Sequence, residues 1–314
     1  MSANCAILCV PKGGISDSLC QINKCWNHCR NTSRDLFIAD QWSDGLMGLM
    51  GSFIHILPHA DGAPAVKFIS HLDSTDFTSL QAYSSTYPEA LHQRLDLVEH
   101  ARYIGNIRNY AIPISETKLV IANCSMVDNK HFAFKDLLVH VACGRGNLSN
   151  DFASRIRLRQ SSKNILQSII GSTDSDLGVD FIGIHVRNTD NTLKLDWKQF
   201  IQGVLAENPQ ERILICSDDR HVIDYCLKLD KNFYTVGGKV PFLRHNQQQL
   251  HSLEYTKNHS EKIDFLAKSF IDLIFLSRAK KIYAPKAHPW GDKFSGFTKL
   301  ANSLRCVGND LLRQ

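Results

Sequence analysis

The stretch from Asp180 to Asn191, DFIGIHVRNTDN, constrains the fold of this chain more than any other. Its first half is apolar and rich in β-prone residues. A run of this length is typical of a parallel strand that is buried on both faces. The sequence becomes polar where that strand would end, and open α/β sheets bind ligands in the crevice at the carboxyl ends of their strands. We therefore expect a functional site to begin here.

His185 and Arg187 stand at this strand end. They are two residues apart, so their side chains point to the same face of the strand. A guanidinium fixed there is a permanent bidentate donor for a phosphate, and the imidazole adds a second polar group beside it. The alternative interpretation is that Arg187 makes a structural ion pair.

Short apolar runs and amphipathic periods alternate along the rest of the chain, which predicts a parallel sheet with covering helices. At 314 residues the chain has the length of two domains, and we place their boundary between residues 155 and 156. Strands are expected over 5–10, 35–40, 53–57, 118–122, 212–216, 233–236 and 281–284. Helices are expected over 15–29, 88–103, 131–143, 155–159, 197–205, 221–229 and 261–279, with a last helix from about 295 and a long loop over 244–260.

A glycine pair follows the first strand, in the segment Pro11-Lys12-Gly13-Gly14. Gly13 and Gly14 would let a phosphate or a sugar approach the main chain at the start of the next helix. A tight turn that needs glycine for structural reasons is the alternative. The segment is similar to the PK-x-G loop of sulfotransferases, and it fits neither GxGxxG nor GxxxxGK[ST].

Asp272 lies inside the apolar run FIDLIFL, where an unpaired carboxylate would be costly. It therefore needs a partner. A guanine edge offers adjacent N–H donors that one carboxylate can accept, whereas Arg187 or a backbone cap would be a structural partner.

Two further groups of polar residues close predicted elements. Ser295, Phe297 and Thr298 stand at a helix start, where hydroxyls, free N–H groups and the helix dipole favour a phosphate. Ser295 also suits an N-cap, and the two roles are compatible. Asp218 belongs to Ser-Asp-Asp at a strand end, where contact with a ribose and simple turn formation are both open.

Composition narrows the function less than these motifs do. The 36 basic and 31 acidic residues give a net charge of +5, with no long basic run that would suggest a nucleic-acid groove. The ten cysteines fall partly in apolar runs, and without a secretory signal we interpret them as thiols in a reducing compartment. The spacing of Cys20, Cys25 and Cys29 is wider than structural zinc sites prefer, so no metal site is expected. The sequence shows neither a signal peptide nor a transmembrane helix.

Three segments, in order, resemble the fucosyltransferase superfamily that includes the α1,6-, α1,2- and protein O-fucosyltransferases. The segment HVRNTD at 185–190 is similar to the HxRxTD donor motif of that superfamily. A strand ending in Ser-Asp-Asp follows at 213–219. The run from DLIFLS at 272–277 to FSGFTKLA at 294–301 resembles the closing signatures. The resemblance implies a GT-B fold, an α/β arrangement in which two Rossmann-like domains face each other across a cleft. The acceptor side would be 1–155 and the donor domain 156–314.

The resemblance also implies an activity, the inverting and metal-independent transfer of fucose from GDP-fucose to a glycan hydroxyl, with no cofactor. It puts His185 and Arg187 on the nucleotide, with Arg187 at the β-phosphate. It puts Asp272 near guanine and residues 295–298 around the diphosphate. The α1,6 enzymes carry a second Arg after the first, and Asn188 stands there in this chain.

A general base could deprotonate the acceptor. Asp17 and Asp40 are our candidates, because both are expected in strand-end loops. The expected partners are a nucleotide-sugar donor and a glycan or lipid-linked saccharide acceptor, in a cytoplasmic protein of polysaccharide biosynthesis, with peripheral contact to the inner membrane face compatible with its charge. Three alternatives stay open: a GT-B transferase using another nucleotide sugar, a sulfotransferase-like enzyme, and a non-catalytic nucleotide- or glycan-binding protein.

Overall fold

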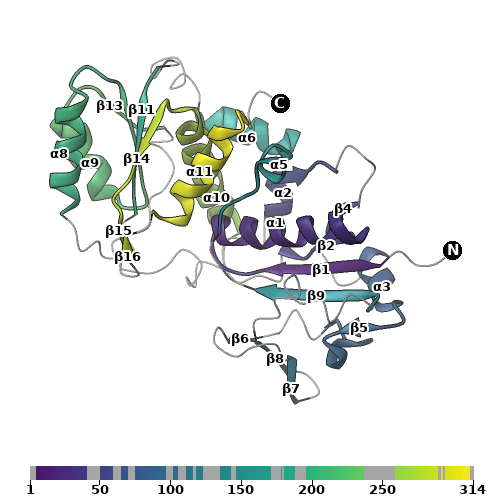
Figure 1. Cartoon of the computed structure of the whole chain (residues 1–314). Coiled ribbons are helices and arrows are strands. Elements are labelled where there is room, and N and C mark those ends of the chain that lie inside the picture. Colours follow the sequence, from purple (N-terminus) through teal and green to yellow (C-terminus); the bar gives the residue numbers. More distant parts are fainter. Residues whose placement is uncertain are drawn as a thin grey trace. The chain divides into compact units, whose positions relative to one another are not determined.

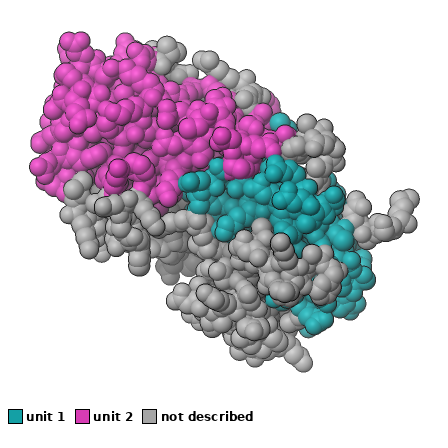
Figure 2. Space-filling view, viewed as in Figure 1, with its two compact units in different colours: residues 1–148 teal, residues 149–314 magenta. Residues whose placement is uncertain are grey.

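The computed structural model of the chain divides into two compact units, Met1–Leu148 and Ser149–Gln314 (Figure 2). The structure describes residues 5–40, 50–58, 65–69, 75–96, 102–104, 111–115, 118–122, 135–142, 146–170, 178, 180–187, 196–236, 259–288, 291–292 and 294–311. The predicted loop over 244–260 falls almost entirely outside these residues, as do Asn188, Thr189 and Asp190 of the donor-like motif.

The first unit is built on a five-stranded parallel sheet with the order β4-β2-β1-β9-β5. Its strands are β1 (Ala6–Pro11), β2 (Asp35–Ile38), β4 (Val66–Phe68), β5 (Thr86–Tyr87) and β9 (Leu137–Ala142). Every residue of β1 is buried, which fits its continuous apolar sequence at the centre of the sheet.

The helix α1 (Ile15–Thr32) follows β1 along the sheet (Figure 1). Its apolar stripe recurs every three to four residues and includes Leu19, Ile22 and Trp26, all buried as the sequence predicts. A buried hydrogen bond of 3.0 Å joins Gln21 Oε1 on α1 to His140 Nε2 on β9, and it fixes the helix on the strand. The first unit also contains α2 (Met50–Phe53), β3 (Ile54–Ile56), α3 (Thr75–Gln81) and a 3₁₀ turn (Glu89–Leu91).

Two helix predictions in the first unit are wrong. Residues 137–142, expected within a helix over 131–143, form β9 beside β1. Their continuous apolar run, LLVHVA, suits either state, and sheet pairing decides it. The helix expected over 88–103 is instead the 3₁₀ turn at its start and β6 (Arg102–Ile104) at its end. β6 joins a small sheet with β7 (Ala111–Ser115) and β8 (Lys118–Ala122), in the order β6-β8-β7.

The second unit is built on a four-stranded parallel sheet with the order β13-β12-β11-β14. Its strands are β11 (Ile182–Val186), β12 (Ile213–Ser217), β13 (Phe233–Tyr234) and β14 (Lys281–Tyr283). The predicted organising strand is therefore central and entirely buried. Its helices are α5 (Asn150–Ala153), α6 (Gln160–Ile170), α8 (Trp197–Glu207), α9 (Arg220–Leu229), α10 (His259–Arg278) and α11 (Gly296–Cys306).

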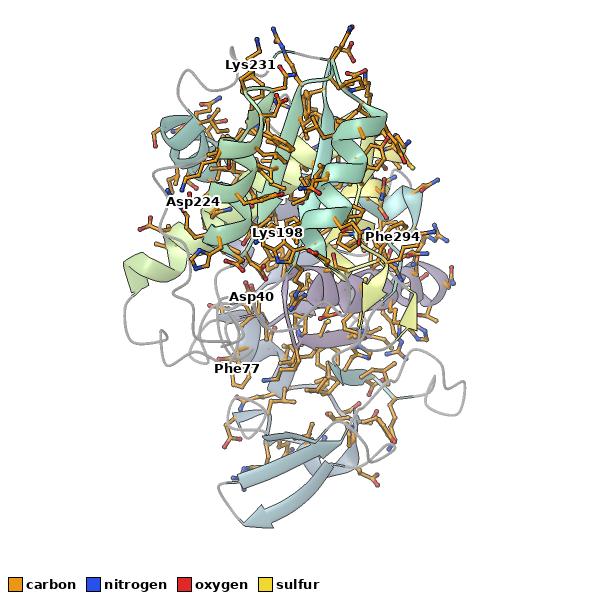
Figure 3. All side chains as sticks on the ribbon, turned by 90° about the vertical axis from the view of Figure 1, so that its left-hand side faces the viewer. Asp40, Phe77, Lys198, Asp224, Lys231 and Phe294 are labelled. Atoms are coloured by element: carbon orange, nitrogen blue, oxygen red, sulfur yellow. The ribbon has the colours of Figure 1, made fainter. Side chains whose placement is uncertain are left out.

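The two faces of β11 have different partners. Ile182, Ile184 and Val186 pack in one apolar core with residues of α8 and α9, which stand in front of the sheet in Figure 3, where Lys198 and Asp224 mark them. Gly183 faces α10, because a Cβ there would lie 2.7 Å from Leu276 and 3.3 Å from Ala279. Strand side chains alternate, so His185 shares the α10 side with Gly183, and Arg187 continues that row.

The start of the second unit is tied to its carboxyl end. Asn309 donates from its side-chain amide to the carbonyls of Ala153 at 2.5 Å and Ile156 at 3.2 Å. This tie explains why the division falls at Leu148, before the predicted boundary after residue 155. The stretch over 155–159, expected to be helical, contains the short strand β10 (Ile156–Leu158). A small antiparallel pair, β15 (Ala287–His288) and β16 (Gly291–Asp292), precedes α11. No helix among the described residues is long and apolar enough to cross a membrane.

Candidate functional site

Three polar side chains meet beside the carboxyl end of β11. His185 Nδ1 lies 2.9 Å from Thr298 Oγ1 and 3.2 Å from Ser295 Oγ, and the two hydroxyls are 3.0 Å apart. All three residues are buried. The sequence separates His185 from the two hydroxyls by more than a hundred residues, and the parallel sheet brings the end of β11 to the start of α11.

The start of α11 is built as predicted. Ser295 is its N-cap, with its hydroxyl accepting from the Thr298 backbone N–H at 3.2 Å. The ring of Phe297 lies 5.0 Å from the imidazole of His185, centroid to centroid, at a tilt of 30°. Phe294, the residue before Ser295, is labelled in Figure 3. A helix N-terminus with its first N–H groups directed outward favours an anion, so the cap and the anion site are compatible roles.

His185 is held neutral at this position. Burial, and then the positive charges of Arg187 and Lys268, lower its pKa from 6.5 to about 3. A neutral imidazole both donates and accepts, so Nδ1 can exchange hydrogen bonds with either hydroxyl. Arg187 itself is half-buried.

The peptide group before Arg187 is fixed by the neighbouring strand. Ser217, the last residue of β12, donates from its hydroxyl to the carbonyl of Val186 at 2.7 Å and accepts from the backbone N–H of Asp219 at 3.1 Å. Val186 and Ser217 are also register partners in the sheet. Ser217 therefore fixes the backbone at the end of β11. The orientation of the following residue, Arg187, depends on this hydrogen bond.

The other two residues of the Ser-Asp-Asp segment have separate positions. Asp219 is the N-cap of α9 and accepts from the backbone N–H of His221 at 2.9 Å. Asp218 lies between them, half-buried. The segment thus forms a turn, and it lies at the carboxyl end of the sheet.

Asp272 has an ion-pair partner that the sequence reasoning did not name. Its Oδ2 lies 2.6 Å from Nζ of Lys268, one turn earlier on α10, and both residues are buried. Arg187 and a backbone cap were the structural partners considered from the sequence. Burial raises the pKa of the Asp272 carboxyl, and the ammonium of Lys268 opposes that shift. The second oxygen, Oδ1, is buried and accepts no hydrogen bond from the described residues.

Lys268 is the residue of this region that sequence reasoning missed. Its signal was present, because Lys268 and Asp272 have the i, i+4 spacing at which opposite charges meet on a helix. The apolar run around Asp272 drew attention to the carboxylate alone. His185, Arg187, Lys268, Asp272, Ser295 and Thr298 all belong to the second unit.

The glycine segment of the first unit starts α1. Gly13 has φ of 98°, a backbone conformation that favours glycine, and Gly14 is the N-cap residue in extended backbone. The backbone N–H of Ser18 donates to the Gly14 carbonyl at 2.9 Å. A Cβ at Gly14 would meet nothing within 4 Å, so this position does not need glycine for space. The preceding Lys12 is buried.

The two candidate bases have different settings. Asp17 lies in the first turn of α1 and is half-buried, so its expected place in a strand-end loop is wrong, because the helix begins immediately after Gly14. Asp40 follows β2 as expected and is buried, and its Oδ2 accepts from the backbone N–H of Gly51 at 2.6 Å. The Asp40 carboxylate is therefore partly engaged in holding α2.

No group of three or more His, Cys, Asp or Glu in the described part of the chain could hold a metal ion. The cysteines of that part are all free thiols, and Cys20 and Cys29 hydrogen-bond to the carbonyls of Gly146 and Asp35. The wide cysteine spacing thus serves packing and hydrogen bonding.

Together the sheets and covering helices define an α/β protein of the GT-B class with two Rossmann-like units, as the sequence predicts. A comparison with protein-family models finds no match, and a comparison with curated protein sequences finds none either. Solved structures do match over almost the whole chain. The structure of NodZ α-1,6-fucosyltransferase soaked with GDP-fucose is 16% identical, covers 96% of this chain and 92% of its own, and has a TM-score of 0.60.

Two further solved structures also match over almost the whole chain. Fucosyltransferase NodZ from Bradyrhizobium is 16% identical, with 95% of this chain and 93% of that chain covered and a TM-score of 0.60. POFUT1 in complex with GDP-fucose is 10% identical, with 97% and 95% covered and a TM-score of 0.52. At these identities the likeness establishes that this chain shares the fold of these proteins.

Proposed function

We propose that this chain is a glycosyltransferase that transfers fucose from GDP-fucose to a glycan hydroxyl, with inversion and without a metal ion. The observation that carries the proposal is the meeting of His185, Ser295 and Thr298 at the carboxyl end of β11, where His185 is followed by Val186 and Arg187. The shared fold with NodZ, whose structure was solved after soaking with GDP-fucose, supports the choice of donor.

The chemistry follows from where charge develops. The acceptor oxygen forms a bond to the anomeric carbon while the bond from that carbon to the β-phosphate oxygen breaks, so GDP leaves with the bonding electrons. Negative charge grows on the β-phosphate. Arg187 and the N-terminal N–H groups of α11 stabilise that charge, and preorganised electrostatics of this kind is typically the largest catalytic term. His185, kept neutral, holds the two hydroxyls of the helix start in position.

The proton of the acceptor hydroxyl needs a destination. Asp17 is the better of the two candidate bases, because Asp40 is buried and already accepts a backbone N–H. Gly13 and Gly14 are proposed to bring the main chain close to the donor or the acceptor sugar. The acceptor class, a glycan or a saccharide on a lipid carrier at the inner membrane face, is the part of the proposal that rests on sequence reasoning alone.

The decisive experiment measures release of nucleoside diphosphate from GDP-fucose, GDP-mannose and UDP-glucose by the wild type, by Arg187→Ala and by Arg305→Ala. We expect GDP-fucose to be the best donor. Arg187→Ala should lower kcat by on the order of 10²–10³, the cost of removing one contact to a developing charge. Arg305, exposed in the last turn of α11, is the matched control and should leave the rate unchanged.

Each outcome has a defined meaning. Preferential turnover of UDP-glucose would reject the donor, and an unchanged rate in Arg187→Ala would reject the role of that residue. Binding of GDP without any turnover across an acceptor panel would identify a nucleotide-binding protein instead. The sulfotransferase alternative rests on Pro11-Lys12-Gly13-Gly14 alone, and the structural likeness does not favour it.

A further inference from the structure

Lys286 follows β14, the strand that pairs with β11 on the side away from β12. The last register pair of the two parallel strands joins Ile184 to Tyr283. Arg187 and Lys286 each stand three residues beyond that pair, so they are level with each other along the chain. Because the strands are parallel, both residues leave the sheet at its carboxyl edge. The two strands therefore deliver one cation each to the edge where the proposed site lies.

The ammonium of Lys286 has an aromatic neighbour at the start of α11. Its Nζ lies 5.6 Å from the centroid of the Phe294 ring. Phe294 directly precedes Ser295, the N-cap of α11, so this contact holds the cation beside the first turn of that helix. Lys286 is exposed and forms no ion pair with any side chain that the structure describes.

This position is electrostatically unfavourable for a cation. The free N–H groups at a helix start carry a partial positive charge, and the first turn of α11 contains no acidic residue that would offset it. Cations are stabilised at the opposite end of a helix, where Arg305 stands in α11. An anion at the helix start would attract the ammonium and the N–H groups together, and it would turn this repulsion into binding.

We propose that Lys286 binds the β-phosphate of the donor and is a catalytic residue in addition to Arg187. The inference rests on the proposed function. Lys286 lies between the closing signatures at 272–277 and 294–301 and belongs to neither, so the resemblance does not assign it a role. In the transfer step the ammonium donates a hydrogen bond to a β-phosphate oxygen and keeps its protons. The electron pair of the breaking bond goes to that phosphate, where a second cation stabilises the added charge.

Calorimetry with GDP and GMP measures this contact, because the two ligands differ only in the terminal phosphate. Lys286→Met removes the charge and keeps an unbranched side chain. It should weaken GDP binding about 10-fold, the size of one charge-assisted hydrogen bond, and change GMP binding by less than about 2-fold. Lys286→Arg keeps a cation that suits phosphate and should bind GDP within about 2-fold of the wild type.

Lys281→Met is the matched control. Lys281 is also exposed and also lies over an aromatic ring, with its Nζ 4.2 Å from the centroid of Tyr283, but it stands at the start of β14. The control should bind both nucleotides as the wild type does. Equal losses of GDP affinity in Lys281→Met and Lys286→Met would show a general effect of protein charge and would overturn the assignment.

Turnover of GDP-fucose tests the catalytic part of the role. The kcat of Lys286→Met should fall by at least about 10-fold, because the β-phosphate carries more negative charge in the transition state than in the bound donor. A phosphate on the acceptor is the other source of an anion for this cation. Unchanged GDP affinity and kcat, with a raised KM for a phosphate-bearing acceptor, would place Lys286 on the acceptor and overturn the assignment.

The failure of this inference is distinguishable from that of the proposed function. A wild type that binds GDP more tightly than GMP, with the same ratio in Lys286→Met, would overturn the role of Lys286 and leave the proposed donor in place. A wild type that binds neither nucleotide would overturn the proposed function and this inference together.

Discussion

Lowering the pH from 7 to 5 should destabilise the fold through His185, and the structure sets the size of the effect. The pKa of His185 falls from 6.5 to about 3 on folding, because of burial and then of the charges of Arg187 and Lys268. Below pH 6.5 the unfolded chain therefore binds a proton at this residue that the folded chain does not. Stability is fully present above 6.5 and is lost progressively as the pH falls towards 3. Between pH 7 and pH 5 the loss amounts to about 2 kcal/mol.

Urea denaturation of the wild type and of His185→Asn at pH 7, 6 and 5 measures this term. Asparagine keeps a hydrogen-bonding group near the Nδ1 position but does not titrate, so the variant should lose about 2 kcal/mol less over this range than the wild type. Equal losses in the wild type and in His185→Asn would refute the buried, neutral state of His185 and, with it, the geometry of the site.

Three further predictions concern the surroundings of the site. Ser217→Ala should lower the turnover of GDP-fucose about 5-fold with a small change in KM, because it removes a hydrogen bond to the Val186 carbonyl that is worth about 1 kcal/mol. Ser217→Thr keeps the hydroxyl and should retain the rate. A normal rate in the alanine variant would contradict a positioning role for Ser217. Gly13→Ala should reduce the free energy of unfolding by about 1–2 kcal/mol, because Gly13 has a positive φ. Gly14→Ser should be neutral or slightly stabilising, because Gly14 is the N-cap in extended backbone with open space around it. Equal effects of the two substitutions in thermal denaturation would contradict the different backbone requirements of these positions. Transfer should proceed unchanged after exhaustive treatment with EDTA, and a loss of rate restored by a divalent cation would contradict the metal-independent mechanism.

The site could be predicted from the sequence where a local pattern decides the outcome. Ser295 caps the last helix as its residue type and the following amphipathic period indicate. The buried strand ending at Val186 follows from its apolar run, and the glycine at position 13 follows from the turn after β1. In each case the physical cause lies within a few residues of chain.

Other expectations failed because non-local contacts settle them. The continuous apolar run over 137–142 is compatible with either a helix or a strand. Its parallel pairing with β1 makes it a strand. The boundary between the units moves to residue 148 because Asn309, at the far end of the chain, binds the carbonyls that follow it.

By itself, the sequence determined that this is an α/β protein with a buried strand that ends in His-Val-Arg, since apolar runs and strand periodicity act locally. Only the tertiary structure decided which side chains share a site. It placed Ser295 and Thr298 against His185, and it set the hydroxyl of Ser217 on the carbonyl before Arg187. The physical reason is that burial and electrostatics depend on distances in space. A parallel sheet brings together residues that are far apart along the chain, and no local sequence pattern reveals that they are close.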